Sequence, residues 1–500
     1  MTHTAQAREL LAAPAEAADP RRWQALWVVL IAAFMDILDA TVVFLAVPFI
    51  QRGLGASDTQ VQWTLAGYTL AFAALLITGG RLGDVFGRKR LYLIGVAGFT
   101  AASVLCGLAP SAEALIAGRV LQGGLAGLMV PQVLSIIQAS FPPRERGAAF
   151  GAFGAVLGLG NVGGPLIAGL VLQADFLGLG WRPIFLMNLP LGLLALAGVW
   201  ALQRESRSPH PLRLDLPGVA LASAALLLVL YPLVQGRDLG WPAWTYAMMA
   251  ASLPVFALFA LHERRRTRRD DSPLVPIDLF ARPAFVSGLL VALCLFAAIT
   301  AFFLVYSLLA QVGLGLTPLA AGLIALPWPL GIAVASGASI TLAPTVGRRL
   351  LSVGTLLLAA GMGALIVALR LGGADVAPWH LIPGLALGGL GMGMVAPTLT
   401  DFVLAGVPGQ DAGAASGVLN TVFQVGSAAG VALAGTLLFA LLATRAGLGA
   451  DALQAAGQQA QRLVFVTAAQ RVLWLQLAAC LLSCALVPLL PRKPQVHEPA

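Results

Sequence analysis

The sequence predicts an all-α membrane protein with fourteen transmembrane helices, arranged as two six-helix bundles plus two extra central helices. Apolar residues make up 59% of the chain and charged residues 10%. Soluble domains average roughly 45–50% and about 25%. The mean hydropathy is +0.87. The apolar residues come in long blocks, each with the roughly 20 residues that a helix needs to cross a bilayer.

The apolar blocks divide as six, two and six. We expect the first six spans at 24–50, 61–80, 90–109, 111–140, 147–172 and 183–203, and the extra pair at 217–235 and 243–262. The last six are expected at 284–310, 318–342, 350–370, 379–406, 412–442 and 469–490. The predicted domains are a cytoplasmic tail (1–23), the N-terminal bundle (24–205), the extra helices with a basic cytoplasmic loop (206–270), the C-terminal bundle (271–490) and a cytoplasmic tail (491–500).

The distribution of positive charge supports this count. An even number of spans places both termini on one side, and twenty-two of the thirty Lys and Arg residues then fall on that side. Because cytoplasmic loops carry the excess of Lys and Arg, this side is predicted to be the cytoplasm. The strongest basic cluster, His262 to Asp271, is interpreted as a cytoplasmic loop, with contact to anionic lipid as the alternative.

The net charge of +8 does not indicate a nucleic-acid partner, because the positive charges lie in short segments between spans. The four cysteines, Cys106, Cys294, Cys480 and Cys484, all lie within apolar segments. No histidine completes a metal-ligand set beside them, so we expect packing residues, without disulfides or a metal site.

An enzyme is also disfavoured. The five histidines lie in loops or near the termini and form no cluster with a nucleophile. No GxxxxGK[ST] phosphate-binding loop occurs, so ATP is not expected to drive the protein. We expect no cofactor.

The run Gly80-Arg-Leu-Gly-Asp-Val-Phe-Gly-Arg-Lys-Arg90 carries five charges in eleven residues between the second and third spans. Such a segment must lie at a membrane surface, where its glycines permit close backbone contact and Asp84 can pair with an arginine. A shorter copy, Gly347-Arg348-Arg349, follows the corresponding span of the last six. Repeated six-span halves are typical of transporters that rock about a central site. We predict an inner gate formed by Gly80, Gly83, Asp84, Gly87, Arg88, Lys89 and Arg90.

Few charges lie inside the spans, where each costs about 2.5–3.5 kcal/mol. Asp36 and Asp39 share a face of the first span, Arg119 lies in the fourth and Asp401 near the inner end of the twelfth. Two neighbouring carboxylates in a site of low dielectric can bind and release a proton. We predict proton coupling by Asp39, Asp36 and Arg119. The alternatives are that an aspartate caps a distorted helix, or that Arg119 forms a permanent ion pair.

Small and polar residues mark two further spans. Gly160, Gly164, Pro165 and Gly169 in the fifth span are predicted to form a hinge or seal between the halves, with close helix packing as the alternative. We expect a central substrate cavity lined by Gln122, Tyr68, Phe302, Tyr306, Asn420 and Gln424. Trp63 is interpreted as an interfacial anchor.

Five motifs in order carry a resemblance to a known family. These are residues 38–48 (LDATVVFLAVP), the Gly80–Arg90 run, 119–124 (RVLQGG), 160–169 (GNVGGPLIAG) and 181–192 (WRPIFLMNLPLG). They resemble the major facilitator superfamily, and its fourteen-helix drug:proton antiporters in particular. The resemblance implies a role for Asp39 and Arg119 in proton transfer, and an exporter from the fifth-span motif. Two departures, Phe44 in place of a common Asn and no acid in the core of spans ten and thirteen, argue against broad recognition of polycationic drugs.

We therefore expect a proton-driven exporter of a drug or small amphipathic metabolite that works by alternating access. The alternatives are a dedicated metabolite exporter and a proton-coupled uptake carrier. The expected partners are the small-molecule substrate, protons and membrane lipid, and the expected state is a monomer in the cell membrane.

Overall fold

The computed structural model describes residues 20–175, 178–207, 215–236, 239–270, 275, 277–404, 407, 412–446 and 457–491. These residues are helical with short connections, and none of them lies in a strand. Most of the two predicted cytoplasmic tails, residues 1–19 and 492–500, lies outside the described residues, as does part of the predicted loop at 208–214.

The N-terminal bundle comprises α2 (Arg22–Leu54), α3 (Asp58–Phe86), α4 (Arg88–Gly107), α5 (Ala112–Ser140), α6 (Pro143–Ala174), α7 (Pro183–Leu186) and α8 (Asn188–Leu202). The extra pair is α9 (Leu216–Gln235) and α10 (Ala243–Asp270). The C-terminal bundle comprises α11 (Pro283–Leu308), α12 (Pro318–Ala325), α13 (Pro327–Val346), α14 (Arg348–Gly372), α15 (Ile382–Leu404), α16 (Ala412–Ala446) and α18 (Gly457–Leu486). Short 3₁₀ or π turns, η2 to η6, lie at 277–281, 309–313, 373–375, 378–381 and 487–489.

The number of spans agrees with the prediction. Within the described residues, thirteen helices are long and apolar enough to cross a membrane, and a bent pair brings the count to fourteen. The bent pair is α3, whose segments Asp58–Leu76 and Thr78–Phe86 meet at 47°. One of the thirteen, Pro318–Ser339, is made of α12 and the first part of α13, which are separated at Leu326.

Two helices run past the predicted span by eight residues or more. Helix α10 continues through the basic cluster to Asp270, so the residues expected to form a loop from His262 are helical. Unlike a buried charge, a charge on a helix that projects beyond the bilayer is solvated and does not end the helix. Helix α18 begins at Gly457, twelve residues before the apolar block at 469. Both errors arise because hydropathy locates the membrane and not the end of the helix.

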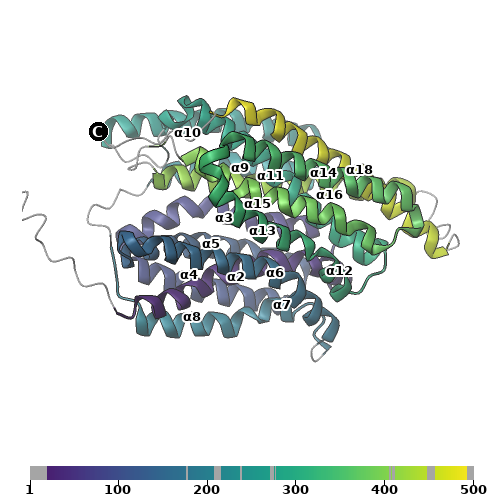
Figure 1. The fold of residues 1–500 in the computed structure, drawn as a ribbon, viewed down its shortest axis with the longest axis horizontal. Coiled ribbons are helices and arrows are strands. Elements are labelled where there is room, and N and C mark those ends of the chain that lie inside the picture. Colours follow the sequence, from purple (N-terminus) through teal and green to yellow (C-terminus); the bar gives the residue numbers. More distant parts are fainter. Residues whose placement is uncertain are drawn as a thin grey trace, which may run out of the picture.

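The two bundles lie side by side, with the purple and blue N-terminal helices below the green and yellow C-terminal helices in Figure 1. Contacts between the bundles join α3 to α16, α6 to α12 and α2 to α11. The extra helix α9 packs on α10 and also touches both α3 and α16. The extra pair therefore lies along one of the lines at which the bundles meet.

Successive spans alternate in direction, which defines two ends of the molecule. We call the end that carries Gly87, between α3 and α4, the Gly87 end. The other end, which carries the connection from α2 to α3, is called the opposite end.

Candidate transport site

A buried ion pair lies inside the N-terminal bundle. Arg119 of α5 is 2% exposed and Asp39 of α2 is 1% exposed. The Arg119 Nη1 atom donates to Asp39 Oδ2 at 2.5 Å. Gln122 Nε2 donates to the other carboxylate oxygen at 2.9 Å, and Asn188 Nδ2 of α8 lies 3.3 Å from that same oxygen. A buried charge needs a partner and hydrogen bonds to be tolerated, and the Asp39 carboxylate has both.

Arg119 is held on several sides. Its Nη1 also donates to Gln122 Oε1 at 2.8 Å, and its Nε donates to the Thr64 carbonyl of α3 at 3.2 Å. The guanidinium lies over the Tyr68 ring with Cζ 4.2 Å from the centroid, a cation–π geometry. These contacts use the planar fork of arginine, which lysine does not have.

A second carboxylate adjoins the pair. Asp36, three residues before Asp39 on α2, accepts a hydrogen bond from the Tyr68 hydroxyl at 2.5 Å. Tyr68 therefore contacts Asp36 through its hydroxyl and Arg119 through its ring. Tyr68 thereby connects the Asp36 carboxylate to the guanidinium that binds Asp39.

The local sequence explains how these helices come close enough. The i, i+3 spacing puts Asp36 and Asp39 on one side of α2, and Arg119 and Gln122 on one side of α5. A Cβ on Gly123 would lie 2.1 Å from the Tyr68 carbonyl oxygen, so this close approach of α5 to α3 requires glycine. The sequence assigned Asp36, Asp39 and Arg119 to proton coupling, and Gln122 and Tyr68 to the substrate cavity. In the structure all five side chains lie together.

Sequence analysis missed three polar partners, Asn188, Ser103 and Thr64. Asn188 is 1% exposed and also donates to Ser103 Oγ of α4 at 2.9 Å, so it connects α4 to the Asp39 carboxylate. The sequence feature that could have indicated Asn188 is its position as an amide inside an apolar segment, within the motif at 181–192. Thr64 contributes only its backbone carbonyl, so its side-chain chemistry gave no signal.

The Gly80–Arg90 run is mostly helical, and the chain turns at a single residue within it. Helix α3 continues through Phe86 and α4 begins at Arg88, so only Gly87, with φ of +110°, separates them. Asp84 pairs with Arg88 at 2.8 Å, as the sequence suggested. The backbone amides of Lys89 and Arg90 donate to the Glu205 carboxylate at 3.0 and 3.1 Å. These contacts stay within the N-terminal bundle and the segment that follows α8, and a carboxylate is favourable at the N-terminus of a helix.

Of two other predicted gate glycines, Gly83 lies in the close packing of α3 on α5 and Gly80 does not. A Cβ on Gly83 would lie 1.9 Å from Gln132 Oε1, whereas one on Gly80 would meet its nearest atom at 3.8 Å. Arg81, which the prediction passed over, is 8% exposed.

The small residues of α6 form contacts both within and between the bundles. A Cβ on Gly164 would lie 1.9 Å from Thr41 Oγ1 of α2, and one on Gly160 would lie 2.9 Å from Ile37. Nearer the opposite end, a Cβ on Gly169 would lie 2.7 Å from Leu319 Cα of α12. Likewise, a Cβ on Gly322 of α12 would lie 2.5 Å from the Pro165 carbonyl oxygen.

Two polar side chains also join the bundles toward the opposite end. The Ser307 hydroxyl of α11 donates to the Phe44 carbonyl of α2. Gln311 Nε2 donates to the Leu45 carbonyl at 2.8 Å. Together with the α6–α12 contact, these bonds hold the two bundles together near that end.

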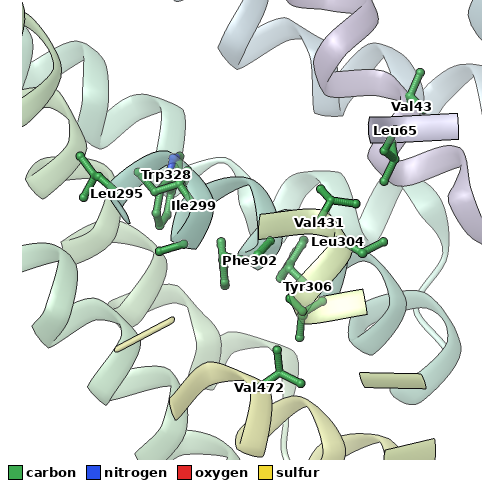
Figure 2. Packing of buried hydrophobic residues seen from close by; sticks show 14 of the residues in the cluster. Val43, Leu65, Leu295, Ile299, Phe302, Leu304, Tyr306, Trp328, Val431 and Val472 are labelled. Carbon is green, nitrogen blue, oxygen red and sulfur yellow. The ribbon is translucent and has the colours of Figure 1, made fainter. Parts of the chain in front are cut away.

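The four residues expected to line a cavity in the C-terminal half do not share one environment: the two aromatic residues are buried and the two amides are half-buried. Phe302 and Tyr306 are 2% and 3% exposed and pack in the aromatic cluster with Trp328 that Figure 2 shows. The Tyr306 hydroxyl donates to the Ala321 carbonyl at 2.6 Å. Asn420 and Gln424 are half-buried on α16, next to the stacked rings of Phe296 and Phe423.

The family follows from comparison of the whole chain. The family model described as Major Facilitator Superfamily matches residues 29–431, which is most of the sequence. The chain belongs to this superfamily. The resemblance of the five motifs is thereby confirmed, and the all-helical, fourteen-span architecture agrees with it.

Relatives of known name are bacterial export and resistance proteins. A probable actinorhodin transporter of Streptomyces coelicolor is 46% identical over 436 residues, covering 86% of this chain and 75% of its own. A puromycin resistance protein of Streptomyces alboniger is 38% identical, covering 86% and 85%. A tetracenomycin C resistance and export protein of Streptomyces glaucescens is 34% identical, covering 85% and 77%.

Among solved structures, a bacterial homologue of the human lysosomal transporter Spinster has a similar fold. The TM-score is 0.69 at 19% sequence identity, and the match covers 97% of this chain and all of the other. At this identity the likeness concerns the fold alone.

Proposed function

We propose that the protein is a proton-driven exporter that exchanges protons for a small, amphipathic, antibiotic-like molecule. One observation carries the proposal: the buried Asp39 carboxylate bonded to Arg119, Gln122 and Asn188, beside Asp36 and Tyr68. A superfamily member needs a titratable group inside the membrane to couple to protons, and charged groups there mark proton pathways. The relatives named for actinorhodin, puromycin and tetracenomycin C support export over uptake.

The geometry suggests how a proton changes the site. When a proton binds the Asp39 carboxylate, the ion pair with Arg119 is lost, while the cation keeps its contacts with Tyr68 and the Thr64 carbonyl. A proton on Asp36 does not prevent the hydrogen bond from Tyr68, because the protonated acid still accepts at one oxygen. Protonation thus weakens the connection between α2 and α5 without unfolding the bundle. A ligand or proton shifts the equilibrium between two states only by its different affinity for them.

We propose that the Gly87 end faces the cytoplasm and that both termini lie there. The excess of Lys and Arg on this side supports the orientation. The contacts of α6 with α12 and of Gln311 with Leu45 then close the outer side, which is the arrangement of a carrier open toward the cytoplasm. In this proposal, Pro165 and Gly169 form the seal against α12, Gly160 and Gly164 hold α6 close to α2, and the Gly80–Arg90 residues form the gate on the other side.

We also propose that the chain divides into bundles at 24–205 and 271–490. We expect the carrier to be a monomer surrounded by membrane lipid. Asn420 and Gln424 are the polar groups that we assign to the substrate path in the C-terminal half. A dedicated exporter of one metabolite is the second candidate, because the 46% identical relative is named for a single compound.

The test measures proton movement that is coupled to the transport of puromycin. Inside-out vesicles that contain the protein are given puromycin, and the internal pH is followed with a dye under an imposed gradient. We expect puromycin to dissipate the gradient for the wild type and to have no effect for Asp39→Asn, which keeps the size of the side chain. The matched control is Asp401→Asn, because Asp401 is an exposed aspartate near the end of α15. Proton release that continues unchanged in Asp39→Asn contradicts the coupling role.

A further inference from the structure

The hairpin of extra helices α9 and α10 contacts both bundles, and the proposed function assigns it no role. The C-terminal half of α9, which is nearer the opposite end, packs in one small apolar cluster with α3 and α16. This cluster contains Leu230 and Val234 of α9, Ala66 and Leu70 of α3, and Ala428 and Ala432 of α16. A helix in this position must either move with one bundle or separate from both when the bundles rock.

Toward the opposite end, α9 is joined to α3 by a polar contact. Trp63 Nε1 of α3 donates to Gln235 Oε1 at 3.1 Å. The Trp63 ring also lies against Tyr231 of α9, with centroids 5.8 Å apart, and Tyr231 in turn packs on Trp244 of α10. The indole N–H of Trp63, interpreted from the sequence as an interfacial anchor, is thus used in a contact between helices.

At the Gly87 end, the extra pair carries two buried acids. Asp215, which caps α9, and Glu263 of α10 are 2% and 0% exposed. Asp215 Oδ1 accepts from the Gly218 amide at 3.0 Å and lies 2.8 Å from His262 Nε2 and 3.5 Å from Arg266 Nη1.

The charge that these acids face comes from α3. The guanidinium of Arg81 is buried at the end of α3, and the opposite charges that act on it are Glu263 and Asp215. Arg266 is the like charge in the same group. Groups of opposite charge gather in this buried site, which is the condition for holding charges there. The bond that joins α9 to α3 is the one between Trp63 and Gln235 toward the opposite end, and the buried acids of the hairpin lie in the electrostatic surroundings of Arg81 at the Gly87 end.

Glu263 has a further contact that extends beyond the hairpin. Its Oε2 accepts from the Val275 backbone amide at 3.0 Å, in the segment that leads into α11. A Cβ on Gly218 would lie 2.4 Å from Asp215 Oδ2 and 2.6 Å from Glu263 Oε1. A Cβ at this position would therefore displace the two carboxylates from their present places.

The contact of α9 with α16 is chemically different. The α16 side chains in the shared cluster are Ala428 and Ala432, which offer α9 a smooth apolar surface. Small residues let helices pack closely without fixing a register by hydrogen bonds. Such a surface suits sliding, whereas the polar contacts with α3 suit a fixed attachment.

We propose that the α9–α10 hairpin is a fixed part of the N-terminal bundle, joined to α3 by the bond between Trp63 and Gln235, and that it slides against α16 during transport. In this arrangement, Asp215 and Glu263 are positioning residues that set the place of the Gly80–Arg90 run through Arg81. The inference rests on the proposed alternating movement of the bundles. It assigns the extra pair to one moving unit and gives its buried acids a role.

Cross-links between helices test the assignment directly. The four native cysteines are replaced by alanine, and two cysteine pairs are introduced, Trp63→Cys with Gln235→Cys and Val234→Cys with Ala432→Cys. The first pair links α9 to α3 and the second links α9 to α16. Puromycin transport is measured before cross-linking, after it and after reduction, so that recovery on reduction shows that each variant is folded.

We expect the α3–α9 cross-link to leave transport nearly unchanged. The α9–α16 cross-link should slow transport at least about tenfold, because it ties the moving bundles together. The reverse pattern, or equal effects of the two cross-links, overturns the proposal.

A second measurement needs no transported compound. Spin labels at the exposed positions Phe86 and Leu261 report the α3–α10 distance, and labels at Leu227 and Leu433 report the α9–α16 distance. At acid and neutral pH we expect the first distance to stay constant and the second to change. Arg81→Gln should broaden the first distribution, a readout that loss of stability alone does not produce.

These outcomes separate the two proposals. If puromycin is not transported but the α9–α16 distance still changes at a constant α3–α10 distance, the proposed substrate is wrong and the hairpin assignment stands. If the α3–α10 distance changes, or if Arg81→Gln leaves it as sharp as before, the assignment is wrong whatever the transport result.

Discussion

At the scale of single residues, the central finding is that a buried carboxylate is held by three donors from two helices. Arg119 and Gln122 reach Asp39 from α5 and Asn188 reaches it from α8. The ion pair was one of the alternatives that the sequence left open, and the structure has it. An ion pair in this conformation is compatible with proton coupling, because a carboxylate that leaves its partner in another state changes its affinity for protons.

Replacing Arg119 with lysine tests whether charge alone is enough. We expect transport to fall at least about tenfold, because an ammonium group cannot bond Asp39, Gln122 and the Thr64 carbonyl together. We also expect the protein to lose about 1–3 kcal/mol of stability, since buried acceptors are left without donors. Thermal unfolding in detergent and vesicle transport measure the two effects.

The matched control is Arg182→Lys. Arg182 donates to the Ala109 carbonyl at 3.2 Å near the opposite end, away from the carboxylates. If Arg119→Lys transports as fast as this control, the fork of Arg119 has no special role.

At the scale of elements, the packing of α6 depends on where along the helix a glycine lies. A Cβ on Gly169 would lie 2.7 Å from the α12 backbone, whereas one on Gly158 would have no atom within 4 Å. The sequence marks both as small residues in the same helix. Only the positions of α2 and α12 distinguish a glycine at a contact from one with open space beside it.

A leucine at position 169 should disturb the contact between the bundles. We expect Gly169→Leu to separate α6 from α12 and to increase labelling of a cysteine placed at Thr41, beside the Gly164 contact, by a small maleimide added from the opposite end. Gly158→Leu is the control in the same helix and should label like the wild type. Equal labelling of the two variants contradicts a role of Gly169 in closing this end.

The contact between the first turns of α2 and α6 gives a pH-dependent prediction. Arg22 forms two bonds of 2.8 Å with the Glu145 carboxylate, and these hydrogen bonds lower the pKa of Glu145 from 4.5. A carboxylate with a lowered pKa contributes stability above its unfolded value, and that contribution is lost as the pH falls through the folded value. Glu145→Gln should therefore reduce the unfolding temperature at neutral pH and have little effect at a pH well below 4.5. A reduction of the same size at both pH values would assign the effect to packing.

At the scale of the whole molecule, two bundles meet along several helix pairs, among them α3 with α16, α6 with α12 and α2 with α11, and the extra hairpin covers one of these seams. The contacts between Ser307 and Phe44 and between Gln311 and Leu45 lie toward the opposite end. Rigid bundles that hold together at one end can separate at the other, which is how repeated bundles give alternating access to a central site.

Cysteine labelling in whole cells tests the orientation of the molecule. Arg52 and Arg207 are exposed and lie near opposite ends of the N-terminal bundle. An impermeant maleimide should label Arg52→Cys in intact cells and Arg207→Cys only after the membrane is opened. The reverse result would place the Gly87 end outside and would invert the proposed direction of transport.

The sequence by itself determined the class and the number of spans, because these follow from hydropathy and charge placement. Helical spacing paired Asp36 with Asp39 and Arg119 with Gln122, and the resemblance to the superfamily implied a shared role for Asp39 and Arg119. The tertiary structure decided which groups complete that site, since the partners Asn188 and Thr64 come from helices that sequence spacing cannot bring together. It likewise showed that the Gly80–Arg90 run is nearly all helix, with a single residue at the turn, and that Arg81 faces acids more than 130 residues away. Periodicity is a local property of the chain, whereas a buried charge finds its partner only when the helices have packed.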